Sequence, residues 1–445
     1  MSGGPTPGAA LLDLVAETRF EALPKPAIEM GRLAVLDWWG VTVGGAGEPV
    51  ARLLREAVPE PEGPASILGT DRTASPVTAA LWNGTASHAL DYDDTVLALP
   101  GHVTAPLLPG LLALAEMRDA SGREVLTAFV LGVEVMCRVS QALAPGHYRA
   151  GWHATATLGR LGGAAACARL LGLDAPGVDR AIGLAAAQVA GIQESFGSMA
   201  KPFQVGRAAA DGLLAALLAA RGVTGAAGVL DRPAWARRLS PDWTPGRLSD
   251  GLGRDWAVNE IFFKRFPCCF ATHAALSALL DLAPRLDPET IEAVDLDVCR
   301  TTLLVADQRE PDTGLGGKFS ITYCAASALL HRQVREEHFS AEAVRDLSVR
   351  ALARRVHLFP QTELDETRAR AVVRLRDGSV HESVGDLRIG RDPERLRREL
   401  GVKFQALTEP WLGATESARL RDALGRVDEI EDLTELTRLP GLRGS

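Results

Sequence analysis

The sequence predicts a mainly α-helical protein with a smaller α+β part, and three observations support this. Residues 1–265 show apolar residues at helical spacing in one segment after another. The pattern changes near residue 266, where β-branched and partly alternating runs appear. Helical spacing returns after residue 400. We therefore predict a helical domain over 1–265, an α+β domain over 266–400, and C-terminal helices over 401–445 that pack back on the helical domain.

Alanine and glycine dominate the predicted helices of the first part. The segments "REVLTAFVLGVEVMCRVSQAL" and "GRAAADGLLAALLAARG" combine apolar spacing with small side chains. Because small side chains let helix backbones approach closely, we expect a tightly packed bundle. In "LLGLDAPGVDRAIGLA", a glycine followed by Asp-Ala-Pro predicts the end of one helix and the start of the next.

The α+β domain is predicted from strand patterns with helical segments between them. The run "IEAVDLDVCRTTLLV" is rich in β-branched residues and predicts a strand. Two alternating runs in "RAVVRLRDGSVHESV" flank Asp377 and Gly378, which predicts a hairpin with a type I′ turn. The segments "ITYCAASALLHRQ" and "SAEAVRDLSVRALARRV" have helical spacing.

Composition argues against some classes of partner and indicates a cellular compartment. The net charge of −8 argues against nucleic acid as a partner. The longest apolar stretches are about half the ~20 residues that a bilayer requires, so we expect no membrane span. The six cysteines include no Cys-x-x-Cys pair, which argues against a zinc or iron–sulfur site and favours free thiols in a reducing cytoplasm.

The stretch "ALDYDDT" places three carboxylates within four positions, Asp91, Asp93 and Asp94, shortly after His88. Such a cluster suits metal binding, proton chemistry or the capping of a helix. A metal site is the weakest of these, because the spacing is not that of an Asp-rich "DDxxD" magnesium motif and no second magnesium motif follows. Capping and proton chemistry both stay open on the local sequence.

Three histidines and two lysines lie in unusual surroundings. His102 in "PGHVTAP" and His153 in "GWHATATLG" occupy short polar interruptions, and His153 precedes a helix start, where backbone N–H groups attract anions. His273 follows a cysteine pair in "FPCCFATHAA". Lys201 and Lys264 are isolated among small, apolar or aromatic residues, where a lysine either reaches solvent or binds an anion.

Taken in chain order, these segments match one pattern. The strings "NGTASHALDYDDT…GHVTAP", "GWHATATLG", "GSMAKPFQVGRAAADG", "FFKRFPCCFATHAA" and "GGKFSITYCAASALL" resemble the MmgE/PrpD family, which includes 2-methylcitrate dehydratase, cis-aconitate decarboxylase and iminodisuccinate epimerase. The resemblance covers residues 10–430. It implies a large helical domain with a smaller α+β lid domain, a homodimer, a small carboxylic acid as substrate, and no metal or organic cofactor.

The resemblance also implies roles for individual residues. Matched motif by motif, it assigns catalytic roles to Asp91, His102, His153, Lys201 and His273, and substrate contacts to Thr95, Lys318 and Tyr323. We add Lys264 to the substrate contacts because of its isolated charge. We further expect Asp91 and Thr95 to share the pocket floor, on one face if the turn is helical. Asp91 would hold His102 or Lys201 in its charged form, and Asp93 would cap backbone N–H groups.

Three departures from the family pattern bear on the substrate. Val96 stands where relatives often have histidine, Gln204 replaces the histidine of "KPLH", and Phe270 replaces the arginine of "CCRFTH". Each change removes a polar or basic group. We therefore expect a substrate that is less charged than a tricarboxylate, or bulkier.

The expected activity is that of a cofactor-independent lyase or isomerase. It would transfer a proton at a carbon next to a carboxylate, with dehydration, decarboxylation or epimerisation following. The alternative is a catalytically reduced homologue that binds a ligand without turnover. The retained acid, histidines and lysines favour the enzyme.

Overall fold

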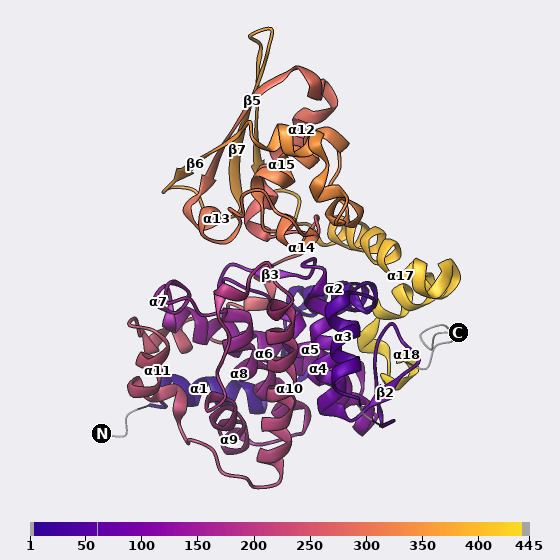
Figure 1. The fold of residues 1–445 in the computed structure, drawn as a ribbon. Coiled ribbons are helices and arrows are strands. Elements are labelled where there is room, and N and C mark those ends of the chain that lie inside the picture. The colour runs from indigo at the N-terminus through magenta and orange to yellow at the C-terminus, as the bar shows by residue number, and fades with distance from the viewer. Residues whose placement is uncertain (1–3, 60, 438–445) are drawn as a thin grey trace.

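The computed structural model describes residues 4–59 and 61–437, and the outer ends of the first and last predicted parts lie outside these. The described chain forms two lobes (Figure 1), each with its own hydrophobic core. The larger lobe is helical and the smaller combines a sheet with helices, which confirms the predicted fold class. We call the larger lobe the helical domain and the smaller the lid.

The helical domain is built from the first eleven α-helices and three short strands. Its short strands are β1 (Ala65–Ser66), β2 (Thr73–Ala74) and β3 (Thr95–Val96). Its helices are α1 (Pro7–Glu17), α2 (Lys25–Gly45), α3 (Pro49–Ala57), α4 (Pro76–Ala89), α5 (Thr104–Arg118), α6 (Gly122–Leu143), α7 (Gly146–Arg149), α8 (Ala154–Leu170), α9 (Ala175–Ala186), α10 (Ala200–Ala220) and α11 (Pro233–Leu239).

Local sequence explains several helix starts. Ser121 and Glu124 form a capping box at the start of α6. The predicted break at Asp-Ala-Pro is confirmed, because α8 ends at Leu170 and the Asp174 side chain caps α9 by accepting from the Gly177 N–H.

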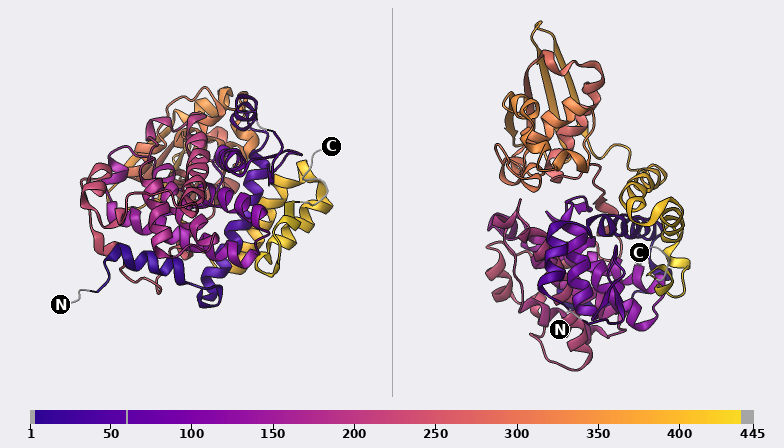
Figure 2. Two further views of the ribbon diagram at one scale, coloured as in Figure 1. Left: turned by 90° about the horizontal axis from the view of Figure 1, so that it is seen from below. Right: turned by 45° about the vertical axis from the view of Figure 1, so that its right-hand side comes forward.

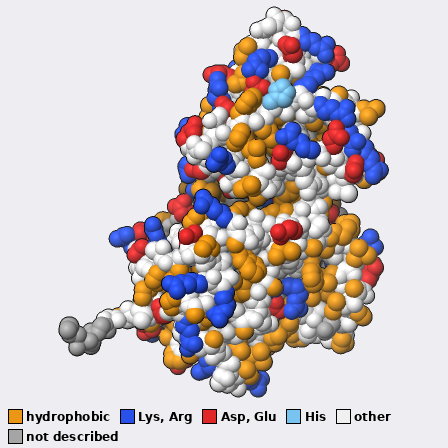
Figure 3. Space-filling view, turned by 60° about the vertical axis from the view of Figure 1, so that its left-hand side comes forward, with side chains coloured by type: hydrophobic (Ala, Val, Ile, Leu, Met, Phe, Trp, Pro, Cys, Tyr) orange, Lys and Arg blue, Asp and Glu red, His pale blue; other side chains and the backbone are white. Residues whose placement is uncertain are grey.

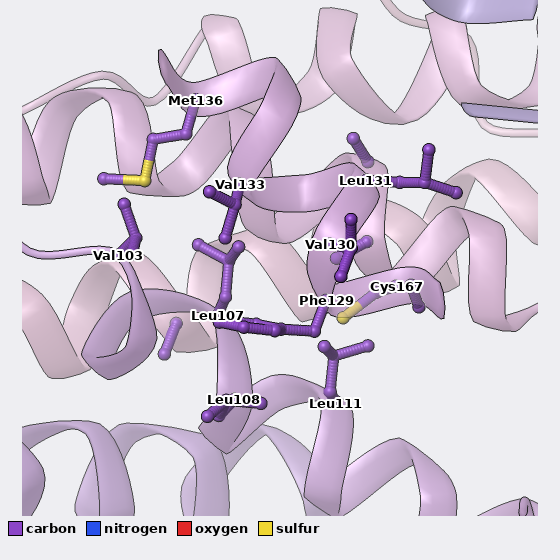
Figure 4. Packing of buried hydrophobic residues seen from close by; sticks show 14 of the residues in the cluster. Val103, Leu107, Leu108, Leu111, Phe129, Val130, Leu131, Val133, Met136 and Cys167 are labelled. Atoms are coloured by element: carbon purple, nitrogen blue, oxygen red, sulfur yellow. The ribbon is translucent and has the colours of Figure 1, made fainter. Parts of the chain in front are cut away.

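The tight packing predicted from the small residues is confirmed where α6 meets α8. A Cβ atom added to Gly162 would lie 2.8 Å from the carbonyl oxygen of Gly132, closer than real Cβ atoms approach. Figure 4 shows α5, α6 and α8 side chains interlocking around Leu107 and Phe129, with Val103 at one edge. Since Val103 directly follows His102, this core anchors one of the candidate site residues.

Two helices are long and apolar enough to cross a membrane by length and composition alone. They are α6, with a mean hydropathy of 1.4, and α10, with 1.2. Within these windows, 94% of α6 and 61% of α10 are buried inside the protein. Packing against neighbouring helices accounts for their apolar surface.

The lid is a four-stranded mixed sheet with helices. Its order is β6-β5-β7-β8, with β5 parallel to β6 and antiparallel to β7, and with β7 antiparallel to β8. Helix α12 packs on β7 and β8, and α15 contacts β6. The bounds are α12 (His273–Leu282), β5 (Ile291–Cys299), α13 (Arg300–Val305), α14 (Gly314–Gly317), α15 (Ile321–His331), α16 (Leu347–Ala353), β6 (Val356–Gln361), β7 (Arg368–Leu375) and β8 (Val380–Asp386).

Two local predictions in the lid need correction. The strand predicted from "IEAVDLDVCRTTLLV" ends at Cys299, and its β-branched second half forms α13, because tertiary context overrides a weak strand propensity. The hairpin joining β7 to β8 is confirmed, but its turn is not type I′. At its tip only Gly378 has a positive φ, +86°, and its N–H donates to the Leu375 carbonyl, which is the pattern of a type I turn followed by a G1 bulge.

The lobes are joined at two points, both close to the candidate residues. Strand β4 (Ile261–Phe262) pairs antiparallel with β3, so that Thr95 lies opposite Phe262. After β8 the chain continues into α17 (Pro393–Leu424), which packs against α2, and then α18 (Thr434–Thr437) (Figures 1 and 2). Helix α17 is kinked at Gly413, where φ is +74°.

Candidate active site

The site begins where α4 ends. The helix stops at Ala89, and Asp91 adopts a left-handed conformation with φ of +50°. Aspartate tolerates this region better than most residues, but glycine is the usual choice, so a carboxylate kept here indicates a role for the side chain. Thr95 follows in β3, not in a helical turn, and its hydroxyl donates to the Gly101 carbonyl at 2.8 Å. Asp91 and Thr95 still line the same pocket.

Two lysine ammonium groups bind the Asp91 carboxylate. Lys201 contacts Oδ1, and Lys264 contacts Oδ2 at 3.0 Å and the Asp91 carbonyl at 2.9 Å. All three side chains are buried. The expected cationic partner Lys201 is therefore present, and Lys264 joins it. Burial opposes the charge of Asp91, but Lys201 and Lys264 outweigh this and hold the pKa of Asp91 well below its ordinary value.

His153, in the pocket wall, has one ring nitrogen bound and the other unbound. Its Nδ1 lies 2.8 Å from Oε1 of Gln204. The Ile192 N–H also donates to this oxygen, and the Gln204 amide donates to Ser195, so the amide orientation is set. His153 therefore donates from Nδ1, and Nε2 has no hydrogen-bond partner among the described residues. The lone pair on Nε2 is available to accept a proton.

His102 and His88 are oriented in a similar way by the acid cluster. The Nδ1 of His102 lies 2.5 Å from the Asp94 carbonyl oxygen and 3.3 Å from the Asp93 carboxylate. The Nδ1 of His88 lies 2.8 Å from the same Asp93 carboxylate. The rings of His88 and His102 meet edge to face, with centroids 4.6 Å apart. Carbonyl and carboxylate acceptors thus set the tautomer of both rings, with the proton on Nδ1.

The capping role expected of Asp93 belongs to Asp94 instead, so that prediction was wrong. The Asp94 carboxylate accepts from the backbone N–H of Thr104 at 3.2 Å and from its hydroxyl at 2.7 Å, at the start of α5. Asp93 is fully buried between His88 and His102. Asp93 and Asp94 are neighbours in the sequence, but their carboxylates reach different donors.

All three histidines of the cluster are held neutral. Burial, followed by the charge of Lys201, lowers the pKa of His153 and of His88 well below the usual value. Burial also lowers the pKa of His102 well below that value, although the Asp93 carboxylate opposes the change. Each neutral imidazole keeps a lone pair that can accept a proton, although burial and the nearby ammonium groups lower its basicity.

His102 and His153 line a small pocket of about 50 Å³, together with Asp91, Lys201 and Lys264, whereas His88 lies behind this wall. Three long helices, α5, α8 and α10, begin at or next to residues of its wall, which turns their partly positive N-terminal ends toward it. Its aromatic wall is Phe196, Phe270 and Phe319. The remaining lining residues are Asp91, Thr95, Pro100, Gly101, His102, Tyr148, His153, Thr155, Lys201, Lys264, Cys269, Ala271, Val305 and Glu366.

His88, Asp91 and His102 also satisfy the spacing of a metal site, with one ligand atom from each lying within 4.8 Å of the others. The chemistry of this set does not fit a cation, however. Both Asp91 oxygens already bind ammonium groups, and a divalent ion would lie beside two positive charges. The site suits an anion better, and a reaction without metal or cofactor stays a prediction.

Three of the expected site residues lie outside this pocket wall. His273 has its Nε2 3.2 Å from the Cys268 carbonyl and packs in the lid. The Tyr323 hydroxyl donates to the His338 carbonyl. Lys318 binds Glu336 and donates to the Leu90 carbonyl at 2.6 Å. These contacts stabilise the lid and its junction with α4.

The structure brings to the site several groups for which the sequence predicts no role. Gln204 was noted only as a missing histidine, and His88 only as a neighbour of the acids. Glu366 comes from the loop between β6 and β7, more than 200 residues from half of the other wall residues. Burial, with help from Asp365, raises the pKa of Glu366 to about 7. Sequence alone held no sign of its proximity to the histidines.

Comparison with known proteins agrees with this architecture. The MmgE/PrpD N-terminal domain matches residues 9–244, and the MmgE/PrpD C-terminal domain matches residues 266–429. The chain belongs to the MmgE/PrpD family. Both matched domains contribute to the site, since Asp91, His102, His153 and Lys201 lie in the first, and Glu366 in the second.

Curated relatives in the MmgE/PrpD family are named as lyases. A cis-aconitate decarboxylase-like protein of Aspergillus oryzae is 28% identical over 97% of this chain and 96% of its own length. A cis-aconitate decarboxylase of Aspergillus terreus is 27% identical over 94% of this chain and 93% of its own. The human cis-aconitate decarboxylase is 28% identical over 82% of this chain and 79% of its own. These relatives support a lyase of this family.

Proposed function

We propose that the protein is a cofactor-independent lyase or isomerase that moves a proton at a carbon next to a substrate carboxylate. The observation that supports this most directly is His153. Its Nδ1 is tied to Gln204, while its buried Nε2 has no partner among the described residues and belongs to the wall of the pocket that holds Lys201. A neutral imidazole in this state is a general base.

The two lysines supply the charge that such a reaction needs. A substrate carboxylate next to Lys201 would be bound by an ammonium group that its ion pair with Asp91 holds in place. When the base removes the proton from the adjacent carbon, negative charge develops on that carboxylate. Lys201, Lys264 and the N-terminal ends of α5, α8 and α10 are fixed in advance to stabilise this charge.

Dehydration and epimerisation begin with the carbanion that this proton removal leaves. In decarboxylation the carbanion forms when the C–C bond to a carboxylate breaks and CO2 departs, and a protonated histidine then delivers the proton that the carbon gains. The relatives named cis-aconitate decarboxylase favour decarboxylation. The wall, however, has Phe270 where family members carry an arginine, together with Phe196 and Phe319. Aromatic side chains in place of a basic group favour a substrate with fewer charges than a tricarboxylate.

Proton exchange in D2O tests the proposal whichever product is formed. A panel of mono-, di- and tricarboxylic acids that includes cis-aconitate is incubated with the enzyme and followed by 1H NMR. We expect deuterium to enter the carbon next to a carboxylate in at least one acid, with loss of CO2 or water for a lyase. Binding without exchange for every acid would instead support a ligand-binding homologue.

We also propose that the chain forms a homodimer in the cytoplasm. Ile192, Met199 and Phe203 are exposed apolar side chains on one segment beside the pocket, and a second subunit would cover such a surface. Light scattering would then give about twice the chain mass of 47.2 kDa. A mass equal to one chain at micromolar concentration would contradict this.

A further inference from the structure

A second, much larger cavity adjoins the small pocket. Its volume is about 940 Å³, and it lies between the helical domain and the lid. The helical domain contributes residues from the loop after β3, the end of α6, α7 and the start of α8, and the lid contributes the end of β5, α13 and the loop after β6. Figure 3 shows the two lobes and the waist between them.

The two cavities share part of their walls. Pro100, Tyr148 and Glu366 line both. The small pocket has room for roughly four waters, since one water needs about 10 to 15 Å³ of such space. It can therefore hold a carboxylate and the carbon next to it, and little more. The rest of any larger acid has to lie in the adjoining cavity.

The walls of the large cavity are mainly apolar. Its apolar residues come from both lobes and are Leu97, Ala98, Pro100, Ala144, Pro145, Ala154, Leu304 and Leu364. The side chain of Leu304 is 79% exposed in this structure, an unfavourable position for a leucine that a bound apolar group would improve. Arg149, Arg300 and Asp365 are exposed charged residues of this wall.

We propose that the substrate carries an apolar substituent several carbons long, which occupies this cavity while the carboxylate binds among Lys201, His102 and His153. This rests on the proposed function and names its substrate class. The apolar walls recognise the substituent by removing it from water.

Simple acids of increasing length test this by calorimetry on the intact enzyme. The probes are butanoate, hexanoate and octanoate, with octanedioate as a probe that carries a second charge. Affinity is expected to rise roughly three- to fourfold for each added methylene that is buried. Octanedioate is expected to bind more weakly than octanoate, because its second carboxylate would lose water on a mainly apolar wall. Tighter binding of octanedioate than of octanoate, through the exposed Arg149 or Arg300, would overturn the proposal.

Two matched leucine variants locate the apolar part. Leu304→Ser should weaken octanoate binding by about tenfold and butanoate binding far less, since only the longer acid reaches α13. Leu347→Ser is the control, because Leu347 is equally exposed at 82% on lid helix α16 but is not part of the cavity wall. Octanoate binding that is unaffected by Leu304→Ser, or equally weakened by Leu347→Ser, would overturn the proposal.

Binding of the same acids to the Lys201→Met variant shows whether a negative result contradicts the apolar substituent alone or the carboxylate site as well. If the proposed function holds, Lys201→Met weakens all the monocarboxylates together. Equal affinity for butanoate and octanoate, both dependent on Lys201, would overturn the apolar substituent and leave the carboxylate site intact. Binding of the acids that is insensitive to Lys201→Met would contradict the carboxylate site itself, and with it the inference that rests on it.

Discussion

His153 of the helical domain and His273 of the lid are both buried histidines at the start of a helix, but their ring nitrogens face different surroundings. His153 precedes α8 and lines the pocket, with one nitrogen held by Gln204 and the other without a partner among the described residues. His273 begins α12, has Nε2 against the Cys268 carbonyl and packs near Phe266 and Phe270. A histidine at a helix start becomes a candidate base only where one nitrogen is held and the other faces space for a substrate.

The same contrast holds for the lysines. Lys201 and Lys264 converge on Asp91 in the pocket wall, whereas Lys318 joins the lid to the end of α4 through Leu90 and Glu336. The helical domain and the junction thus supply the charged groups for proton chemistry. The lid supplies Glu366 and apolar surface. The following predictions test this division, with rates measured on the acid that exchanges fastest in the D2O panel.

The largest effect is expected for His153→Asn. Loss of a general base should lower kcat/KM by about 10²- to 10⁴-fold. His273→Asn is the matched control in the lid, and it should lower the melting temperature while leaving kcat/KM much closer to that of the wild type. Exchange rates by NMR and thermal unfolding measure both. Comparable losses of kcat/KM in the two variants would contradict the distinction between His153 as a base and His273 as a structural residue.

Lys201→Met should lower kcat/KM by about 10²-fold or more, because removing one partner of a buried charge pair costs roughly 2 to 5 kcal/mol. Lys318→Met should have a smaller effect on kcat/KM, arising from the Leu90 carbonyl that it leaves unbound one residue before Asp91. Its main effect should be a lower melting temperature. Full activity of the Lys201→Met variant would show that Lys201 does not bind the substrate carboxylate.

The pH profile should show an acid limb below the usual histidine range. The active base is the neutral imidazole, and burial lowers the pKa of His102 and His153 well below the ordinary 6.5. Activity should therefore persist as pH falls through 6.5, and then decline about tenfold per pH unit below the lowered pKa. Gln204→Leu should alter this limb, since it removes the acceptor that orients His153. An acid limb centred at or above 6.5 would contradict the burial of these rings.

The smallest effect is expected at the hairpin tip of the lid. Gly378 has φ of +86° and open space around it, so Gly378→Ala should cost about 1 kcal/mol through backbone strain alone. Gly246→Ala in the helical domain is the control, because Gly246 does not have a positive φ and a Cβ atom there would meet no close neighbour. Neither variant should change kcat/KM, as neither position lines the pocket.

The sequence by itself determined the helical and mixed parts of the fold, because apolar periodicity and turn residues act over short distances. It also identified Asp91, His102, His153, Lys201 and Lys264, whose charged or polar side chains stand out in apolar surroundings. It was wrong about the turn at Gly378 and about which acid caps α5, since these depend on single backbone angles. The resemblance also assigned roles to His273, Lys318 and Tyr323, but their side chains contact other protein groups outside the pocket wall.

Only the tertiary structure decided which of these residues meet. The pairing of Lys201 with Asp91 joins positions 110 residues apart, and Glu366 reaches the same pocket from the loop between β6 and β7 of the lid. Gln204 illustrates the physical reason. From the sequence, Gln204 shows only that a histidine is missing. In the structure, hydrogen bonds with Ile192 and Ser195 fix the orientation of its amide, and the amide oxygen then accepts from His153. Hydrogen-bond direction and burial are properties of the packed chain, and they decide which nitrogen of a histidine is free to react.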